Sequence, residues 1–338
     1  MSDPLSYTVG WICALPTEYG AVQALFDEKH DRPRYVSRRD SNDYELGRIG
    51  PHNIVAAVFP AGEYGPVCAA TVASDMLSTF TNVRVGLMVG IAGGAPRAEH
   101  DVRLGDVVVG VPRTLFDARP PGDPTSDQQA GNDDIGTSAV EDETPPILQS
   151  AVTTLRAHYD ANGHQLRRAI DEALEKWPRL KKKYQRPDDS TDQLHQPQSP
   201  SLETAEDGHA IQQQSDEPAT LVQRPERAVK GEPAIHYGAI GSSSLLLRNG
   251  PFRERAAEKI DVLCFEMESA GLNGIFRCLV VRGISDYCDV HKNNQWQGHA
   301  AMAAAAYAKD LLCQISLEDM ESQRRMRDVL FGSRRRAF

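Results

Sequence analysis

Short apolar runs and amphipathic stretches alternate through the first third of the chain. Apolar runs bounded by Gly, Pro and polar residues are typical of buried strands, whereas apolar positions spaced by three and four indicate helices. The pattern predicts strands at 7–14, 44–49, 53–60, 84–91 and 105–112. It predicts helices at 17–28 and 65–80. Strands that alternate with helices favour an α/β layered fold.

The helix predicted at 65–80 begins after Gly65 and has Pro66 in its first turn, a position that proline favours. Its apolar and small residues recur at spacings of three and four, which predicts a buried face. That face consists of Val67, Ala70, Thr71, Ser74 and Leu77.

The alternation returns near the C-terminal end. Strands are predicted near 235–241, 260–267 and 278–285. Helices are predicted at 251–259, 269–275 and 298–315. The last of these is rich in alanine, so we expect it to pack closely against the sheet.

The composition changes between these two parts. Residues 117–145 carry many Asp, Pro, Gly, Ser and Thr, and two helices are predicted after them, at 146–162 and 164–183. Residues 185–232 are rich in Gln, Pro, Asp and Ser and cannot bury a useful core, so we expect disorder there.

A structureless stretch of this length is uncommon inside a compact domain, which favours a surface insertion. We therefore divide the chain into a domain built from 1–116 and 234–316, an insertion over 117–233, and a basic tail over 317–338. The tail is predicted to be an appended helix followed by clustered arginines.

The bulk composition is that of an ordinary globular protein. Of the 338 residues, 25% are charged and 40% are apolar, and the net charge of −10 argues against nucleic acid as a partner of the core. No apolar run reaches the ~20 residues needed to span a bilayer, and the N-terminus lacks the features of a signal peptide. We expect a cytoplasmic protein without membrane contact; the arginine-rich tail makes nuclear entry an alternative.

The cysteines and histidines do not indicate a metal site. The six cysteines show no CxxC spacing, and most fall in apolar runs, which is typical of buried reduced thiols. His291 and His299 lack further ligands at a spacing suited to zinc. We therefore expect neither a metal nor a disulfide framework.

Two apolar runs near the C-terminal end finish in carboxylates. The run VLCFEMESA at 262–270 contains Glu266 and Glu268, and the run CLVVRGISD at 278–286 ends at Asp286. A carboxylate at the tip of a buried strand is seldom fully buried without a partner or a function. The two strand ends therefore predict a polar pocket at the edge of the sheet.

Six segments, in order along the chain, resemble motifs of one protein family. They are VGWICAL at 9–15 followed by Glu18, GLMVGIAGGA at 86–95, LGDVVV at 104–109, YGAIGSSS at 237–244, FEMESA at 265–270 and RGISDYCD at 282–289. These segments are similar to motifs of the nucleoside phosphorylase/nucleosidase superfamily, most of all to its branch in filamentous fungi. The resemblance implies a single three-layer α/β domain, in which helices flank a twisted mixed central β-sheet and the insertion interrupts the chain. It also implies a homo-oligomer.

The resemblance implies a role for each carboxylate in cleaving an N-glycosidic bond. Asp286 would protonate purine N7, which near neutral pH requires a raised pKa such as an apolar strand end can supply. Glu268 would accept hydrogen bonds from the ribose hydroxyls, and Met267 would contact the sugar. The structural alternatives are a loop cap for Asp286 and core filling for Met267. Glu266 alternates to the opposite face of its strand, so we expect it outside this pocket, in a salt bridge or helix cap.

Glu18 distinguishes hydrolysis from phosphorolysis. It matches the position at which the nucleosidase branch carries the glutamate that orients the attacking water; the structural alternative is a first-turn residue that interacts with a helix dipole. Phosphorylases hold phosphate with arginines, and this chain has Met88 at one such place and no arginine at 16–20. We expect a purine nucleoside or nucleotide N-ribohydrolase without metal or organic cofactor. The alternatives are a phosphorylase with inorganic phosphate as co-substrate, and a nucleoside- or nucleotide-sensing module with weak or lost catalysis.

Further contacts are expected around the base and the sugar. The base pocket would contain Ser243, Ser244, Leu246 and Ser285. Backbone groups of two glycine-containing loops would meet the ligand at Gly62, Ile91, Ala92 and Gly93. For Arg282 we expect an ion pair within the fold, with a 5′-phosphate contact by Arg282 or His291 as the alternative.

Overall fold

The structure is a computed structural model of the chain, and it describes residues 1–111, 137–139, 144–196, 201–204, 210–213, 220–243 and 249–334. Only the backbone is described at 137–139, 201–204, 210–213, 243 and 331–334. Of the residues predicted to contact the base, Ser244 and Leu246 lie outside the described residues.

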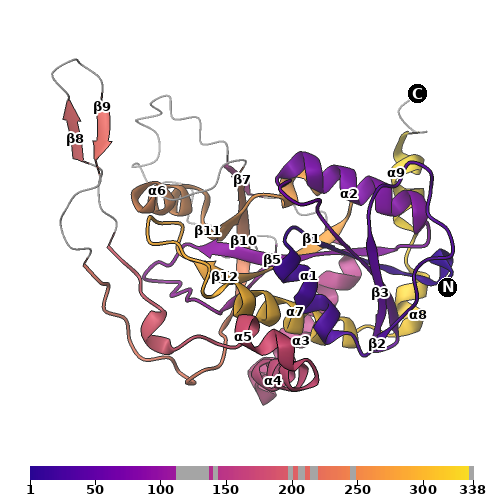
Figure 1. Cartoon of the computed structure of the whole chain (residues 1–338), viewed down its shortest axis with the longest axis horizontal. Helices are drawn as coiled ribbons and strands as arrows, with labels where there is room; N and C mark the ends of the chain where they lie inside the picture. Colours follow the sequence, from indigo (N-terminus) through magenta and orange to yellow (C-terminus); the bar gives the residue numbers. More distant parts are fainter. Residues whose placement is uncertain are drawn as a thin grey trace.

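A mixed β-sheet forms the centre of the molecule (Figure 1). Its strands lie in the order β11-β10-β6-β12-β5-β1-β4-β3-β2, and β7 pairs with β10. The bounds are β1 Val9–Cys13, β2 Glu28–Lys29, β3 Tyr44–Ile49, β4 His52–Val58, β5 Val85–Gly94, β6 Val107–Gly110, β7 Thr137–Ala139, β10 Ile235–Ser243, β11 Val262–Glu266 and β12 Cys278–Asp286. Strands β4, β1, β5 and β12 are parallel to their neighbours in this series, which places their C-terminal ends together.

The sheet curls so that its first strand in this order also meets β5. Phe265 of β11 pairs with Gly93 of β5, in antiparallel register, while Asp286 of β12 pairs with the same glycine on the other side. The ends of β11 and β12 therefore lie on either side of the glycine-rich end of β5.

Helices cover both faces of the sheet, which gives the three layers that the sequence predicts (Figure 1). One face carries α1 Pro16–Leu25, α3 Pro146–Asn162, α4 Leu166–Lys176, α5 Lys181–Tyr184 and α7 Gln297–Cys313. The other carries α2 Pro66–Thr79, the 3₁₀ helix η4 Ser269–Leu272 and α9 Met326–Arg334. Alternate residues of β1 enter the two cores, because successive side chains of a strand point to opposite faces. The remaining helices are α6 Gly250–Ile260, beside β11, and α8 Leu317–Ser322.

Most predicted elements occur within a few residues of their expected bounds, and two differ. The helix predicted at 164–183 is interrupted after α4, where the 3₁₀ helix η2 Pro178–Leu180 begins, because proline lacks an N–H and clashes with the preceding turn. The helix predicted at 269–275 is only the single turn η4, which contains Gly271 and is followed by Gly274 at φ 70°. Glycine is a poor helix former, and Gly274 takes the left-handed conformation that ends the turn.

The predicted buried face of α2 is wrong except at Leu77, which is buried. Val67, Thr71 and Ser74 are exposed. The helix instead buries Cys68, Ala69, Val72, Ala73, Met76 and Leu77 against the sheet. The stripe through these residues is the more apolar of the two.

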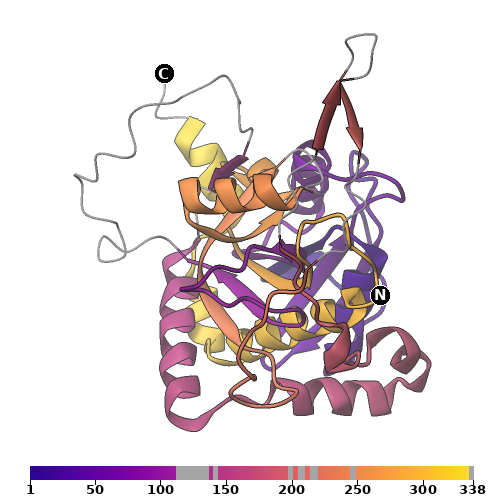
Figure 2. The same cartoon turned by 90° about the vertical axis from the view of Figure 1, so that its left-hand side faces the viewer.

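Part of the insertion is ordered, contrary to the expectation of disorder across 185–232. Segments 185–196 and 220–232 pack against the domain, and Leu194 is 8% exposed in the core. Ion pairs also hold these segments, among them Arg224 with Asp192. The low apolar content of these segments in the sequence does not reveal such ion pairs. Strands β8 Ser201–Thr204 and β9 Ala210–Gln213 pair only with each other and project from the body (Figure 1, Figure 2).

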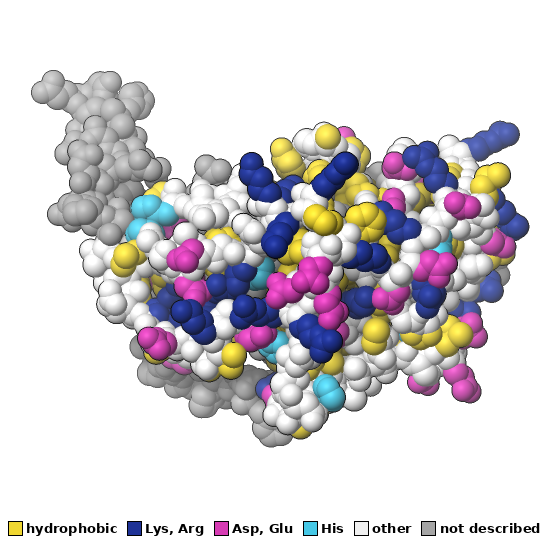
Figure 3. Space-filling model, turned by 60° about the horizontal axis from the view of Figure 1, so that its bottom comes forward, with side chains coloured by type: hydrophobic (Ala, Val, Ile, Leu, Met, Phe, Trp, Pro, Cys, Tyr) yellow, Lys and Arg dark blue, Asp and Glu magenta, His cyan; other side chains and the backbone are white. Residues whose placement is uncertain are grey.

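The surface is of mixed charge on the face in Figure 3, where lysine and arginine side chains are interspersed with acidic ones. Among the helices that the structure describes, none has both the length and the apolar content needed to cross a membrane.

Candidate active site

The end of β5 contains two glycines that make room for charged side chains. A methyl group at Gly90 would overlap Glu18 Oε1 and lie 2.5 Å from Arg282 Nη1. A methyl group at Gly93 would lie 2.8 Å from Asp286 Oδ1. Three residues of extended strand span about 10 Å. Glu18, Arg282 and Asp286 therefore gather along one short stretch of β5.

Glu18 reaches this stretch from the first turn of α1. Its Oε2 accepts hydrogen bonds from the N–H groups of Ala14 (2.7 Å) and Leu15 (2.9 Å), and its Oε1 accepts one from Ile91 (2.8 Å). The side chain therefore caps its own helix and also joins that helix to β5. Burial raises the pKa of Glu18, and the nearby Arg282 partly offsets this effect. A carboxylate with a raised pKa and free lone pairs suits a proton acceptor.

Arg282 is the centre of a buried charge cluster. Its guanidinium is fully buried, and Nη2 contacts Glu266 Oε2 in a short ion pair and lies 3.5 Å from Glu268 Oε2. The expected ion pair of Arg282 is thus present. Glu266 makes the salt bridge expected for it, but it does not lie on the face opposite to Glu268, because both glutamates contact the same arginine. Residues two apart in an extended strand point to the same face, so alternation itself places Glu266 and Glu268 together. Strand β11 ends at Glu266, and Glu268 adopts helical angles of φ −118° and ψ −37°.

The two glutamates differ in how easily they ionise. Burial opposes the charge of Glu266, but Arg282 and hydrogen bonds, including those from Ser269, hold its pKa below the ordinary value. Burial and the neighbouring Glu266 raise the pKa of Glu268 to about 8. Burial would lower the pKa of Arg282, but Glu266, Glu268 and Glu18 raise it above the ordinary value. The cluster therefore keeps Glu266 ionised and a proton on Glu268 near neutral pH.

The raised pKa of Glu268 predicts a pH-dependent stability. Between the ordinary value of 4.5 and about 8, the folded protein holds a proton on Glu268 that the unfolded chain has lost. The free energy of unfolding should therefore fall as the pH rises through this window. Glu268→Gln should weaken this dependence because an amide does not titrate, whereas the control Glu45→Gln, at a half-exposed ion pair, should not. Urea unfolding from about pH 5 to about pH 9 measures this, and parallel curves for wild type and Glu268→Gln would contradict it.

Asp286 has a polar environment rather than the expected apolar one. Oδ1 accepts a hydrogen bond from the Cys288 N–H (3.0 Å), and Oδ2 accepts one from the Ser285 hydroxyl (3.0 Å). The ammonium of Lys292 lies 2.9 Å from Oδ2. Ser285, predicted to contact the base, donates a hydrogen bond to the carboxylate. Sequence reasoning missed Lys292, which lies in a polar loop and is brought to Asp286 only by the fold.

A loop between β4 and α2 covers the other side of the cluster. The carbonyl oxygen of Met267 would lie 3.9 Å from a methyl group at Gly65. Helix α2 also packs closely on η4, because a methyl group at Gly271 would overlap the Pro66 carbonyl. Burial, Glu63 and Glu268 raise the pKa of Cys68 to about 11, so the first turn of α2 lies near Glu268.

The other predicted site residues are placed as follows. Gly62, in the loop before α2, has φ 85° and open space around it. Ile91 donates to Glu18, as described above, and the carbonyl of Ala92 faces the Ser285 hydroxyl at 3.4 Å. Ser243 ends β10, and its side chain is not described. The imidazole of His291 stacks on His195 at 3.7 Å.

The balance of charge around β5 restricts what can bind there. Glu18, Glu266 and Glu268 all interact with the single cation Arg282. A cluster with more carboxylates than cations favours a ligand with hydroxyl donors or developing positive charge and disfavours a phosphate dianion. Among the residues that the structure describes, no group of three or more His, Cys, Asp or Glu is arranged to hold a metal ion.

Comparison with known proteins connects this geometry to a fold. No family model matches the chain. A curated protein of Hyaloscypha variabilis (strain UAMH 11265 / GT02V1 / F), described as a nucleotide-binding leucine-rich repeat (NLR)-like protein, is 38% identical over 321 residues. The match covers 95% of this chain and 30% of that protein, so the chain spans less than a third of the length of this relative.

Solved structures of nucleosidases are similar in three dimensions. The 5′-methylthioadenosine/S-adenosylhomocysteine nucleosidase of Helicobacter pylori has a TM-score of 0.53 and 15% identity, covering 92% of this chain and 99% of that one. Futalosine hydrolase of the same organism has a TM-score of 0.51 and 16% identity, with the same coverage. The Neisseria meningitidis nucleosidase has a TM-score of 0.51 and 15% identity, over 91% and 99% of the two chains. The chain therefore has the three-layer α/β fold of these nucleosidases.

Proposed function

We propose that this protein hydrolyses the N-glycosidic bond of a purine nucleoside or nucleotide. Glu18 orients and deprotonates the attacking water, Glu268 binds the ribose hydroxyls, and Asp286 assists departure of the base. The charge that develops on the sugar is stabilised by the surrounding carboxylates. No organic cofactor takes part in these steps.

The observation that carries this proposal is the burial of three carboxylates, from distant parts of the chain, around the end of one strand. Glu18, Glu268 and Asp286 are 4%, 8% and 4% exposed, and all three lie around the end of β5. Burying carboxylates is costly unless they are paired or serve a function. Packing of a hydrophobic core alone does not require three buried carboxylates at the end of one strand.

The ion pair between Asp286 and Lys292 modifies the role proposed for the acid. A carboxylate that is 2.9 Å from an ammonium has a proton source beside it. We infer that the pair, rather than the carboxyl alone, delivers the proton to the leaving base. When the Lys292 proton moves to Asp286 and then to the base, the pair regains its proton from solvent.

Water is a better nucleophile for this site than phosphate. Phosphate would have to approach Arg282, whose charge is already paired with Glu266 and also interacts with Glu18. Its dianion would therefore meet net negative charge. This supports hydrolysis over phosphorolysis.

The direct test is release of free base. The protein would be incubated with adenosine, inosine, 5′-methylthioadenosine, AMP and ATP, with and without inorganic phosphate. Release without phosphate is the expected result. Release that requires phosphate would overturn the assignment of Glu18 and support a phosphorylase.

Glu18→Gln should lower kcat by about 10²–10⁴-fold and change ligand affinity little, because an amide cannot accept the proton of water. The amide N–H₂ would also face backbone N–H donors now bonded to the carboxylate, so circular dichroism should confirm the fold. Affinity can be measured with an immucillin-type compound, a class bound in two neighbouring structures. The control is Glu28→Gln, at an exposed ion pair with Arg48. A Glu18→Gln enzyme with normal kcat would remove Glu18 from the mechanism.

A second candidate function is a nucleoside- or nucleotide-sensing module. It is favoured by the relative described as NLR-like, of which this chain matches only 30%. Such a module would bind purine nucleosides or nucleotides without releasing base. Saturable binding of adenosine or ATP, together with no turnover of any purine tested, would support this function over hydrolysis.

A further inference from the structure

The residue after Asp286 is held by the insertion. The phenol of Tyr287 is 3% exposed, and its hydroxyl donates a short hydrogen bond to Asp192 Oδ1. It also accepts a hydrogen bond from the Leu104 N–H at 3.2 Å. The guanidinium of Arg224 lies 5.3 Å from the centre of the Tyr287 ring and donates to Asp192 at 2.9 Å. Asp192 and Arg224 both belong to the insertion, one on each side of the β8–β9 hairpin.

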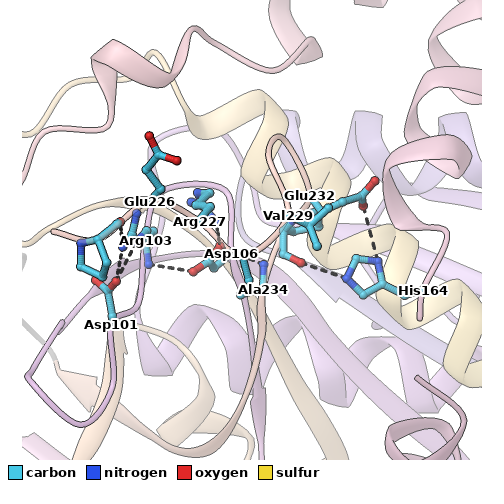
Figure 4. Close-up of a pocket in the computed structure, with 12 residues that line it drawn as sticks. Asp101, Arg103, Asp106, His164, Glu226, Arg227, Val229, Glu232 and Ala234 are labelled. Carbon is cyan, nitrogen blue, oxygen red and sulfur yellow. Dashed lines mark hydrogen bonds and ion pairs between the residues drawn. The ribbon is translucent and has the colours of Figure 1, made fainter. Parts of the chain in front are cut away.

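This contact continues into a second buried carboxylate, Asp106. Arg227 of the insertion lies 2.5 Å from Asp106 Oδ1 and 3.6 Å from Asp192 Oδ2, so it joins the two. Asp106 also accepts from His236 (3.0 Å) and from the Ala234 N–H (3.0 Å). Asp106, Arg227 and Ala234 line part of a cavity of about 340 Å³, in which Arg227 and Ala234 converge on Asp106 (Figure 4). Ion pairs between oppositely charged side chains therefore attach the insertion to the sheet.

Tyr287 directly follows the catalytic strand, and it is held at its backbone as well as at its hydroxyl. Its carbonyl oxygen accepts a hydrogen bond from buried Arg253 of α6 at 2.7 Å. The next residue, Cys288, has φ 53°, which a non-glycine residue adopts only when its surroundings hold it there. The N–H of Cys288 donates to Asp286 Oδ1. The position of the carboxylate thus depends on the anchoring of Tyr287.

We propose that Tyr287, with Asp192 and Arg224, is a positioning group for the acid Asp286, and that the insertion supplies this group. The kinetic part of this inference rests on the proposed function. The insertion is then an integral part of the site. Tyr287 itself does not touch substrate in this account, since its hydroxyl is already bonded to Asp192 and Leu104.

The first experiment compares Tyr287→Phe with wild type. The variant keeps the ring but loses the hydroxyl, so kcat per folded molecule should fall about tenfold while KM changes less than about twofold, because misplacement of a catalytic group slows the chemical step. The matched control is Tyr159→Phe, which removes a hydroxyl that donates to Asp310 at 2.8 Å between α3 and α7. The control should lose stability and keep its kcat. Equal kcat in Tyr287→Phe and Tyr159→Phe would overturn the proposal.

The second experiment does not depend on turnover. Hydrogen exchange of the Cys288 amide reports its bond to Asp286 directly. Tyr287→Phe and Asp192→Asn should each speed exchange of this amide about tenfold or more relative to amides of β1 in the same protein. If wild type cleaves no nucleoside, the proposed function fails and this measurement still decides the positioning role. Unchanged Cys288 exchange in both variants would overturn it, whatever the activity.

Discussion

Asp286→Asn should lower kcat for nucleoside hydrolysis by about 10²–10⁴-fold, the usual contribution of a positioned acid. The amide keeps an oxygen for the Cys288 N–H but cannot carry a proton to the base. The ion pair with Lys292 is lost as well, so the proton source beside the site no longer has a carboxylate to pass through. Steady-state release of base from adenosine or inosine measures the effect.

Two comparisons make this result specific. Lys292→Gln keeps the carboxyl and should reduce kcat less than Asp286→Asn does. Asp27→Asn removes a partly exposed partner of Lys309 elsewhere on the molecule and should leave kcat unchanged. Binding of an immucillin-type compound to Asp286→Asn should persist. Full activity in Asp286→Asn would eliminate this residue as the acid.

Arg282→Met should destabilise the protein by about 3–5 kcal/mol, because removal of one partner from a buried ion pair leaves an uncompensated charge. Glu266 would lose the cation that keeps its pKa low, and Glu268 would lose the same neighbour. Urea unfolding followed by circular dichroism gives the free energy of unfolding directly.

A matched pair of variants separates charge from packing. Arg48→Met breaks an exposed ion pair with Glu28 and should cost less than about 1 kcal/mol. The double variant Arg282→Met/Glu266→Gln removes the stranded charge and should recover part of the lost stability. If Arg282→Met unfolds at the same urea concentration as Arg48→Met, the buried cluster is not what the structure implies.

Local sequence signals were enough for most of the fold. The strands were found because their apolar runs are short and bounded by polar residues or glycine, and β3 falls at 44–49 as predicted. Glu268 and Asp286 stand at the ends of apolar runs and are visible without a structure, whereas Glu18 was singled out through the family resemblance. The gathering of all three around β5 requires the sheet to bring the ends of β11 and β12 together.

The remaining features depend on contacts that no local pattern contains. The salt bridge of Glu266 was expected, but its side was not: residues two apart in a strand share a face, so Glu266 and Glu268 meet the same arginine. Lys292 approaches Asp286 from a polar loop whose composition suggests only solvent exposure. The ordered parts of the insertion are poor in apolar residues, and paired charges such as Arg227 with Asp106 fix them instead.

The curled sheet also affects how the protein meets other molecules. Because β11 turns back to pair with β5, part of a border that would otherwise expose unpaired N–H and C=O groups is occupied within the chain. At the far end the sheet stops at β2, which is only two residues long and carries the exposed side chains of Glu28 and Lys29. A strand from another molecule could form few backbone hydrogen bonds with β2. The closure of the sheet that brings the carboxylates together therefore also disfavours aggregation by edge pairing.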